Sequence, residues 1–212
     1  MEFLSEDLQK YVEDHSEPES DLLQQINRET HLHVLKPRML SGHLQGRVLS
    51  MLSHMIRPKN ILEIGTYTGY AALCMAEGMQ AEGKLITIDN NEELAMRTKG
   101  YFDQSERSGQ IDLHVGNALD IIPALKEKWD LVFIDADKEN YSNYFDLVIN
   151  NVNKGGFIIA DNVLWSGKVF DKSKSDKDTE AIRAFNQKMH TDSRVQNVLF
   201  PIRDGLMILR KL

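Results

Sequence analysis

The sequence has few of the features that mark secreted, membrane or zinc-binding proteins. It contains one cysteine, Cys74, in 212 residues, which excludes an internal disulfide and fits a reducing compartment. No apolar run approaches the roughly 20 residues that a membrane span needs, and the acidic N-terminal segment does not resemble a signal peptide. The seven histidines show no metal-ligand spacing. We therefore expect a cytoplasmic protein that does not use histidine-bound metal.

Acidic residues outnumber basic ones, 32 to 25. The formal net charge of -7 argues against a general surface for nucleic acid or anionic membranes. Hydrophobic residues make up 42% of the chain, and at this length they can bury one sizeable core. We expect a single domain over residues 1–212.

Hydrophobic periodicity alternates between helical and extended segments. Short apolar runs of the kind found here are typical of a parallel sheet covered on both faces. The predicted helices are Glu6–Asp14, Ser20–Val34, Gly42–Ile56 and Thr179–His190, and the first predicted strands are Asn60–Ile64, Lys84–Asp89, Ile111–Val115, Leu131–Asp135 and Phe157–Asp161. Two further strands, Val195–Pro201 and Gly205–Arg210, are too close together for a crossover helix, so the last strand should be antiparallel to its neighbour.

The segment NILEIGTYTGY, residues 60–70, has the pattern of a strand, a glycine-containing turn and a helix start. Such a turn presents backbone N–H groups to a polar cofactor at the sheet edge. Gly65 and Gly69 lack the middle glycine of the dinucleotide fingerprint, and the Glu63 carboxylate would repel phosphate but suit a cationic amino acid. The pattern therefore favours S-adenosylmethionine over NAD, with a purely structural turn as the alternative.

The next two strands also end in residues that suit a nucleoside. Asp89 lies 20 residues after Gly69, the distance at which an acid commonly meets ribose hydroxyls. Alternatively, Asp89 caps the helix that starts near Asn91. The small residues Gly116 and Ala118 would let an adenine lie against the backbone.

Two later strands bring acids to the same edge of the sheet. Asp135 ends one strand, and Asp161 with Asn162 ends another. Three protein oxygens with open positions suit a hard cation such as Mg²⁺ or Ca²⁺. Lys138 lies three residues after Asp135, and a nearby cation would favour its neutral form, which makes it a candidate base. The alternatives are helix caps for the acids and a surface salt bridge for Lys138.

The chain resembles the cation-dependent O-methyltransferases of the catechol and caffeoyl-CoA type in the motifs NILEIGTYTGYAAL, TIDNN, VGNALD, FIDADKENY, ADNVLWSG, TEAIRAFN and RDGLMILRK. The likeness runs from about Lys36 to the last residue, and the pair DADK and DN is specific for this group among methyltransferases. It implies an α/β, Rossmann-like class I methyltransferase fold. Such a fold has a seven-stranded, mostly parallel sheet with an antiparallel last strand and helices on both faces.

The resemblance also implies roles for individual residues. S-adenosylmethionine would be bound by Met39, Ser41, Glu63, Gly65, Tyr67, Ala71, Asp89, Ala118 and Asp135. The metal, Mg²⁺ or another divalent cation such as Ca²⁺ or Mn²⁺, would be held by Asp135, Asp161 and Asn162. Lys138 would be the base, and the substrate would lie against Met39, Lys138, Asn162 and Trp165. Family members often have Ser in place of Ala71, so one hydroxyl contact to the cofactor is missing.

These residues predict Mg²⁺-dependent transfer of a methyl group from S-adenosylmethionine to one hydroxyl of a vicinal-diol aromatic, a catechol or caffeoyl-like small molecule. Two alternatives stay open. Some bacterial relatives methylate a hydroxylated uridine in tRNA, although the net charge of -7 counts against nucleic acid as partner. The second alternative is a non-catalytic S-adenosylmethionine-binding module. We expect residues 1–40 to form a helical lid or the surface of a homodimer.

Overall fold

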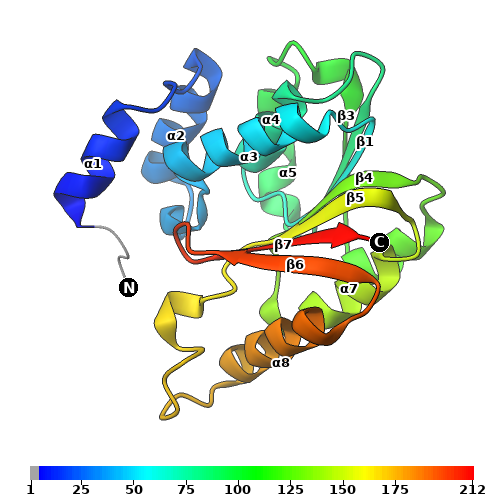
Figure 1. The fold of residues 1–212 in the computed structure, drawn as a ribbon. Coiled ribbons are helices and arrows are strands. Elements are labelled where there is room, and N and C mark those ends of the chain that lie inside the picture. The colour runs from blue at the N-terminus through cyan, green and yellow to red at the C-terminus, as the bar shows by residue number, and fades with distance from the viewer. Residues whose placement is uncertain (1–4) are drawn as a thin grey trace.

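A seven-stranded sheet forms the centre of the molecule, which we describe for residues 5–212 of a computed structural model (Figure 1). The strand order is β3-β2-β1-β4-β5-β7-β6. The strands are β1 (Asn60–Ile64), β2 (Lys84–Asp89), β3 (Ile111–Val115), β4 (Trp129–Ile134), β5 (Val152–Ala160), β6 (Val195–Phe200) and β7 (Leu206–Lys211). Only β7 runs against the others, because it pairs antiparallel with both β5 and β6. The predicted antiparallel last strand is confirmed.

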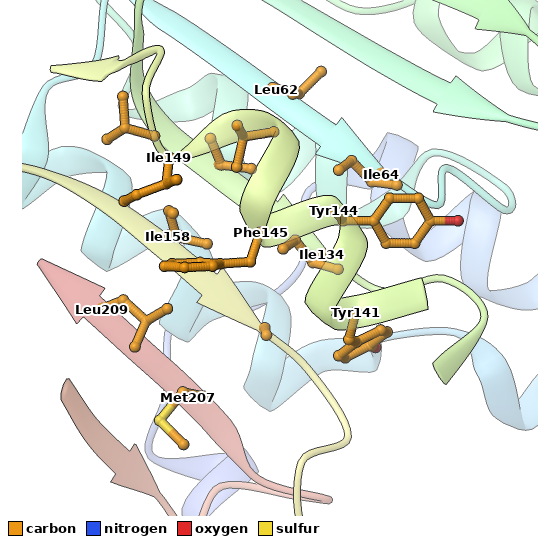
Figure 2. Packing of buried hydrophobic residues seen from close by; sticks show 14 of the residues in the cluster. Leu62, Ile64, Ile134, Tyr141, Tyr144, Phe145, Ile149, Ile158, Met207 and Leu209 are labelled. Carbon is orange, nitrogen blue, oxygen red and sulfur yellow. The ribbon is translucent and has the colours of Figure 1, made fainter. Parts of the chain in front are cut away.

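Helices cover both faces of the sheet (Figure 1). One face packs against α2 (Asp21–His33), α3 (Gly42–Ile56), α4 (Tyr70–Glu77) and α5 (Glu92–Phe102). The other packs against α6 (Ala118–Ile121), α7 (Tyr141–Val148) and α8 (Lys177–Thr191). Figure 2 shows this second core, where Phe145 of α7 lies over the sheet residues Ile134 and Ile158. Apolar residues on both faces explain why the strands read as continuous hydrophobic runs.

The predicted bounds agree closely with the structure, with one difference that matters for the site. The helices Glu6–Asp14 (α1) and Gly42–Ile56 (α3) and the first three strands have the predicted bounds. Strands β4 and β5 begin earlier than predicted and end at Ile134 and Ala160. Asp135 and Asp161 therefore stand one position beyond their strands, in the loops that follow, although the backbone N–H groups of both still donate to neighbouring strands.

The N-terminal helices differ in how firmly they are packed. Helix α2 buries Leu23, Ile26 and Thr30, whereas α1 (Glu6–Asp14) has no buried residue. Residues 1–4 of this segment lie outside the described residues, and its role as a lid or dimer surface stays a prediction. Within residues 5–212, no helix is both long and apolar enough to cross a membrane.

Candidate functional site

A cleft of about 2000 Å³ lies along the carboxyl edge of the parallel strands. Parallel strands point their carboxyl ends to one edge, which is where open α/β sheets bind ligands. The cleft is lined by every site residue predicted from the sequence except Glu63, namely Met39, Ser41, Gly65, Tyr67, Ala71, Asp89, Ala118, Asp135, Lys138, Asp161, Asn162 and Trp165. Residues that are up to about half the chain apart in sequence thus face one space.

The turn after β1 depends on Gly65 for a steric reason. Gly65 has φ +101°, and a Cβ atom at this position would lie 1.9 Å from the carbonyl oxygen of Asp135. No other residue fits such a close approach of two backbones. The turn therefore lies directly against the loop that carries Asp135, which joins the predicted cofactor and metal sites.

Asp89 holds this turn in place. Its Oδ2 accepts hydrogen bonds from the backbone N–H groups of Thr66 (2.9 Å) and Tyr67 (2.7 Å), and its Oδ1 accepts one from Asn91 (2.9 Å). The alternative that Asp89 caps α5 does not describe the structure, because the capping side chain is that of Asn91, which accepts from the backbone of Glu93. Asp89 lines the cleft, and its predicted contact with ribose stays a prediction.

Glu63 lies beneath the cleft instead of along it. Its side chain is fully buried, the hydroxyl of Thr87 donates to its Oε2, and its Oε1 has no hydrogen-bond partner. Burial, followed by the nearby charges of Asp89 and Asp135, raises the pKa of Glu63 well above its usual value. A buried oxygen without a partner is uncommon in folded proteins, and it agrees with a carboxyl group whose charged form is disfavoured by burial.

Asp161 is the most buried charged residue that lines the cleft. Its side chain is 1% exposed, and its two oxygens accept from the backbone of Asn162 and from Nε2 of Gln45, both at 2.6 Å. Burial first, and then the charge of Asp135, raises the pKa of Asp161 to about 7. The expectation of a helix cap does not apply, since no described helix has Asp135 or Asp161 at its N-cap.

Lys138 points to the same acids from the loop after β4. Its Nζ donates to Oδ1 of Asp135 (3.0 Å) and to the hydroxyl of Tyr141 (2.6 Å), and the residue is only 8% exposed. The ion pair with Asp135 that the alternative predicted is present, but it lies in the cleft wall, with the Lys138 and Asp135 side chains 9% and 22% exposed. A buried lysine beside an acid pair is a common arrangement in sites that move protons.

Tyr141 is a site residue that the sequence reasoning missed. Its hydroxyl accepts from Lys138 and donates to the backbone oxygen of Asp161 (3.0 Å), so one group contacts both predicted functional segments. Its ring packs edge-on against Phe185 of α8 at 5.4 Å between centroids. The available signal was its spacing, because a residue three positions after Lys138 returns to the same side of a helical turn.

The loop after β5 is held in an unusual backbone conformation. Asn162, Trp165 and Ser166 all have positive φ values, between 48° and 59°, a region that residues other than glycine seldom adopt. The indole Nε1 of Trp165 is buried without a partner, and the Nζ atoms of Lys138 and Lys168 lie 5.6 and 5.7 Å from its ring centroid. Strained residues of this kind cluster at ligand sites.

The cleft does not contain a ligand set built from histidine or cysteine. Within residues 5–212, no three His, Cys, Asp or Glu side chains come together in a way that would hold a metal ion. A cation at Asp135 and Asp161 would therefore need the carboxamide of Asn162 or oxygens from a ligand. Such an all-oxygen site is suited to a hard cation and not to zinc.

Comparisons with known proteins agree with this geometry. Residues 13–212 match the model of a family described as O-methyltransferase. The chain is 34% identical over 155 residues to a catechol O-methyltransferase of Niastella koreensis, covering 71% of this chain and 70% of that protein. It is 32% identical over 224 aligned residues to caffeoyl-CoA O-methyltransferase 1 of Arabidopsis thaliana, covering 98% of this chain and 85% of that protein.

Solved structures give the same picture. The fold superposes with a TM-score of 0.90 on an O-methyltransferase from Bacillus cereus in complex with SAH, with 27% identity over 97% of each chain. It superposes with a TM-score of 0.89 on the SAH-bound methyltransferase PaMTH1 of Podospora anserina, with 25% identity over 97% of this chain and 94% of that one.

Proposed function

The chain belongs to the O-methyltransferase family, and we propose that it methylates one hydroxyl of a vicinal-diol aromatic small molecule in a reaction that depends on Mg²⁺. It has the class I methyltransferase fold and is an S-adenosylmethionine-dependent O-methyltransferase of the catechol and caffeoyl-CoA type. The acceptor and the metal are the new parts of the proposal. The observation that carries them is that the buried Asp161 and the partly exposed Asp135 line one cleft together with Lys138.

Asp135, Asp161 and Asn162 are the residues that would hold the divalent cation. Two carboxylates and one carboxamide suit Mg²⁺, Ca²⁺ or Mn²⁺. The raised pKa of Asp161, which results from its burial and from Asp135, supports a cation here because a positive charge would offset both effects. When bound, the cation would make an acceptor hydroxyl more acidic, and it would favour a substrate with two adjacent oxygens.

In the neutral form that a nearby cation would favour, Lys138 would receive the proton of the acceptor hydroxyl. Asp135 and Tyr141 hold its Nζ at 3.0 and 2.6 Å, which fixes where the proton goes. The deprotonated oxygen would then attack the methyl carbon of S-adenosylmethionine, so that a C–O bond forms as the C–S bond breaks. Met39 and Ser41 line the cleft and would flank the transferred methyl group, while Trp165 would cover the aromatic ring of the acceptor.

The test is a methyl-transfer assay on a panel of acceptors, with Mg²⁺ or with EDTA. Vicinal diols such as catechol and caffeoyl-CoA should be methylated and monophenols should be poor acceptors, and EDTA should abolish turnover while calorimetry still detects S-adenosylmethionine. Equal rates for monophenols and diols, or full activity in EDTA, would overturn the proposal. Hydroxylated tRNA in the panel tests the alternative acceptor.

Lys138→Ala gives a second test of the same proposal. Its turnover should fall by about 10² to 10⁴, as for other general bases, with S-adenosylmethionine affinity unchanged. Lys99→Ala is the matched control, because Lys99 pairs only with Asp103 on the exposed side of α5. If both variants keep wild-type turnover, the base lies elsewhere.

A further inference from the structure

We propose that Arg203 is a positioning residue that fixes the segment Lys36–Ser41, called here the Met39 segment, against the acidic edge of the site. The inference builds on the methyl-transfer function proposed above. Arg203 lies in the turn between β6 and β7, far along the chain from the Met39 segment, yet both line the same cleft. Arg203 is the first residue of the motif RDGLMILRK, but neither that motif nor the family comparison assigns it a role.

Arg203 contacts the segment almost entirely through backbone oxygens. Its Nη1 donates to the carbonyl of Leu40 at 2.9 Å and to that of Ser41, and its Nη2 lies 3.5 Å from the carbonyl of Arg38. Hydrogen bonds from a charged donor are stronger than those between neutral groups. Because the contacts are with the backbone, they constrain the path of the segment whatever its side chains are.

The backbone at Arg203 supports a specific role for the side chain. Arg203 has φ +48°, a left-handed conformation that glycine adopts without cost and other residues adopt with strain. A turn that needed only to connect β6 to β7 would be more stable with glycine here. The residue at this strained position is instead an arginine whose guanidinium makes several hydrogen bonds. Backbone strain of this kind is common at functional positions.

The Met39 segment is held at its other end by the cofactor turn. The hydroxyl of Tyr67 lies 3.1 and 3.3 Å from the carbonyl oxygens of Leu35 and Lys36. Lys36 itself has φ +57°. The segment is thus fastened on one side to the turn predicted to bind S-adenosylmethionine and on the other to Arg203, with the half-exposed Met39 between the two fastenings.

Arg203 also reaches the acid pair through one intermediate. Its Nη1 lies 3.4 Å from Oε1 of Gln45, and Nε2 of the same amide donates to Asp161 at 2.6 Å. With its oxygen facing the guanidinium, the Gln45 amide presents its nitrogen to the carboxylate. Arg203 therefore orients the Gln45 amide, the neutral group that donates a hydrogen bond to Asp161.

The same turn contacts the opposite wall of the cleft. Asp204, next to Arg203, accepts from the backbone of Ser166 at 2.5 Å, and its carbonyl accepts from Leu164 at 2.8 Å. One short turn thus sets the distance between the Met39 segment and the Trp165 loop. An acceptor ring bound between these walls would lose its fixed position if Arg203 no longer held the segment.

Hydrogen exchange at the Met39 segment tests the proposal directly. The amides of Met39 and Leu40 donate to Lys36 and Pro37 at 2.9 and 3.0 Å and should be protected in the wild type. Arg203→Gly removes the guanidinium and suits the left-handed backbone, so it should not unfold the turn. We expect exchange of these amides to quicken by about tenfold or more, and trypsin to cut faster after Arg38.

Steady-state kinetics separate positioning from a merely structural role. Arg203→Gly should raise the acceptor KM by about tenfold and lower kcat, with the melting temperature unchanged or higher. Arg203→Lys, which keeps the charge but has a single nitrogen, should fall between glycine and wild type. Arg210→Ala is the matched control, since Arg210 on the same hairpin contacts only the exposed Gln196 and should behave as wild type.

Opposite outcomes overturn the inference. Wild-type exchange and wild-type acceptor KM in Arg203→Gly would show that the guanidinium does not position the segment, and a lower melting temperature with unchanged kinetics would make it only a structural contact. If Arg203→Gly fails to fold, the lysine variant carries the same comparison. Failure of the wild-type enzyme to methylate any diol would refute the proposed function. The hydrogen-exchange result would still decide whether Arg203 holds the Met39 segment in place.

Discussion

Glu63→Gln should remove the part of the pH dependence of stability that comes from Glu63, which sets in as the pH rises above 4.5. The substitution keeps the size of the side chain and its acceptor for Thr87 but cannot ionise. In the wild type, Glu63 is fully buried and Oε1 has no partner. Burial, together with the charges of Asp89 and Asp135, raises the pKa of Glu63 well above its usual value of 4.5.

The sign of the effect follows from linkage. A carboxyl whose pKa is higher in the folded than in the unfolded state holds its proton longer when folded. Its contribution to stability is fully present below pH 4.5, its unfolded value, and is lost as the pH rises to the folded pKa. Over that window the free energy of unfolding of the wild type should fall, relative to the glutamine variant, by up to about 1.4 kcal/mol per pH unit.

Urea unfolding at pH 5, 6, 7 and 8, without S-adenosylmethionine, measures this difference. Taking wild type minus variant cancels the contribution of titrating groups that do not interact with Glu63, whereas Asp89 and Asp135 do interact with it. Glu82→Gln, an exposed glutamate in the loop before β2, is the matched control and should follow the wild type at every pH. If the curves of wild type and Glu63→Gln run parallel from pH 5 to pH 8, then Glu63 titrates alike in the folded and unfolded states, and the reasoning from burial is refuted.

Three further expectations concern Tyr141, Cys74 and Asp89. Tyr141→Phe should lower kcat by about tenfold and leave S-adenosylmethionine affinity unchanged, because it removes the hydroxyl that holds Lys138; unchanged turnover would show that Asp135 alone positions the lysine. Cys74 should resist a thiol reagent at pH 8 until urea is added, since burial raises the pKa of its thiol to about 12; rapid labelling of the native protein would contradict this. Asp89→Ala should weaken S-adenosylmethionine binding about tenfold or more. The substitution removes both the predicted ribose acceptor and three hydrogen bonds to the turn. An unchanged dissociation constant by calorimetry would exclude both roles in cofactor binding.

The sheet was predictable because its signals are local. Apolar runs bounded by Gly, Asp and Asn define β1, β2 and β3 within the sequence itself, and the short link before β7 rules out a crossover. The starts of β4 and β5 were missed because Trp129 and the stretch from Val152 to Gly156 are interrupted by polar residues and glycines. Pairing with neighbouring strands extends them there, and no pattern within either segment shows it.

Long-range contacts explain which parts of the site were missed. Arg203 lies in the motif RDGLMILRK without a predicted role, and Gln45 lies in no quoted motif. Their importance comes from what they contact 116 to 163 residues away. The cofactor-binding role that the resemblance implies for Tyr67 stays a prediction, and the contact of its hydroxyl with the backbone of Leu35 was not foreseen from the sequence. A local pattern places a residue at an edge of the sheet, but only the packing of other elements decides what its side chain contacts.

The position of Asp161 in the fold and the pKa of its side chain have different origins. Its place at the end of β5 follows from the sequence, because acids that end parallel strands meet at one edge. Its raised pKa does not follow from the sequence, since the shift arises first from burial and then from Asp135. Gln45 of α3 contributes to that environment and partly offsets the shift through its hydrogen bond. The pKa of this carboxylate therefore depends on how α3 packs on the sheet, so substitutions in α3 that leave every motif intact should still alter the site.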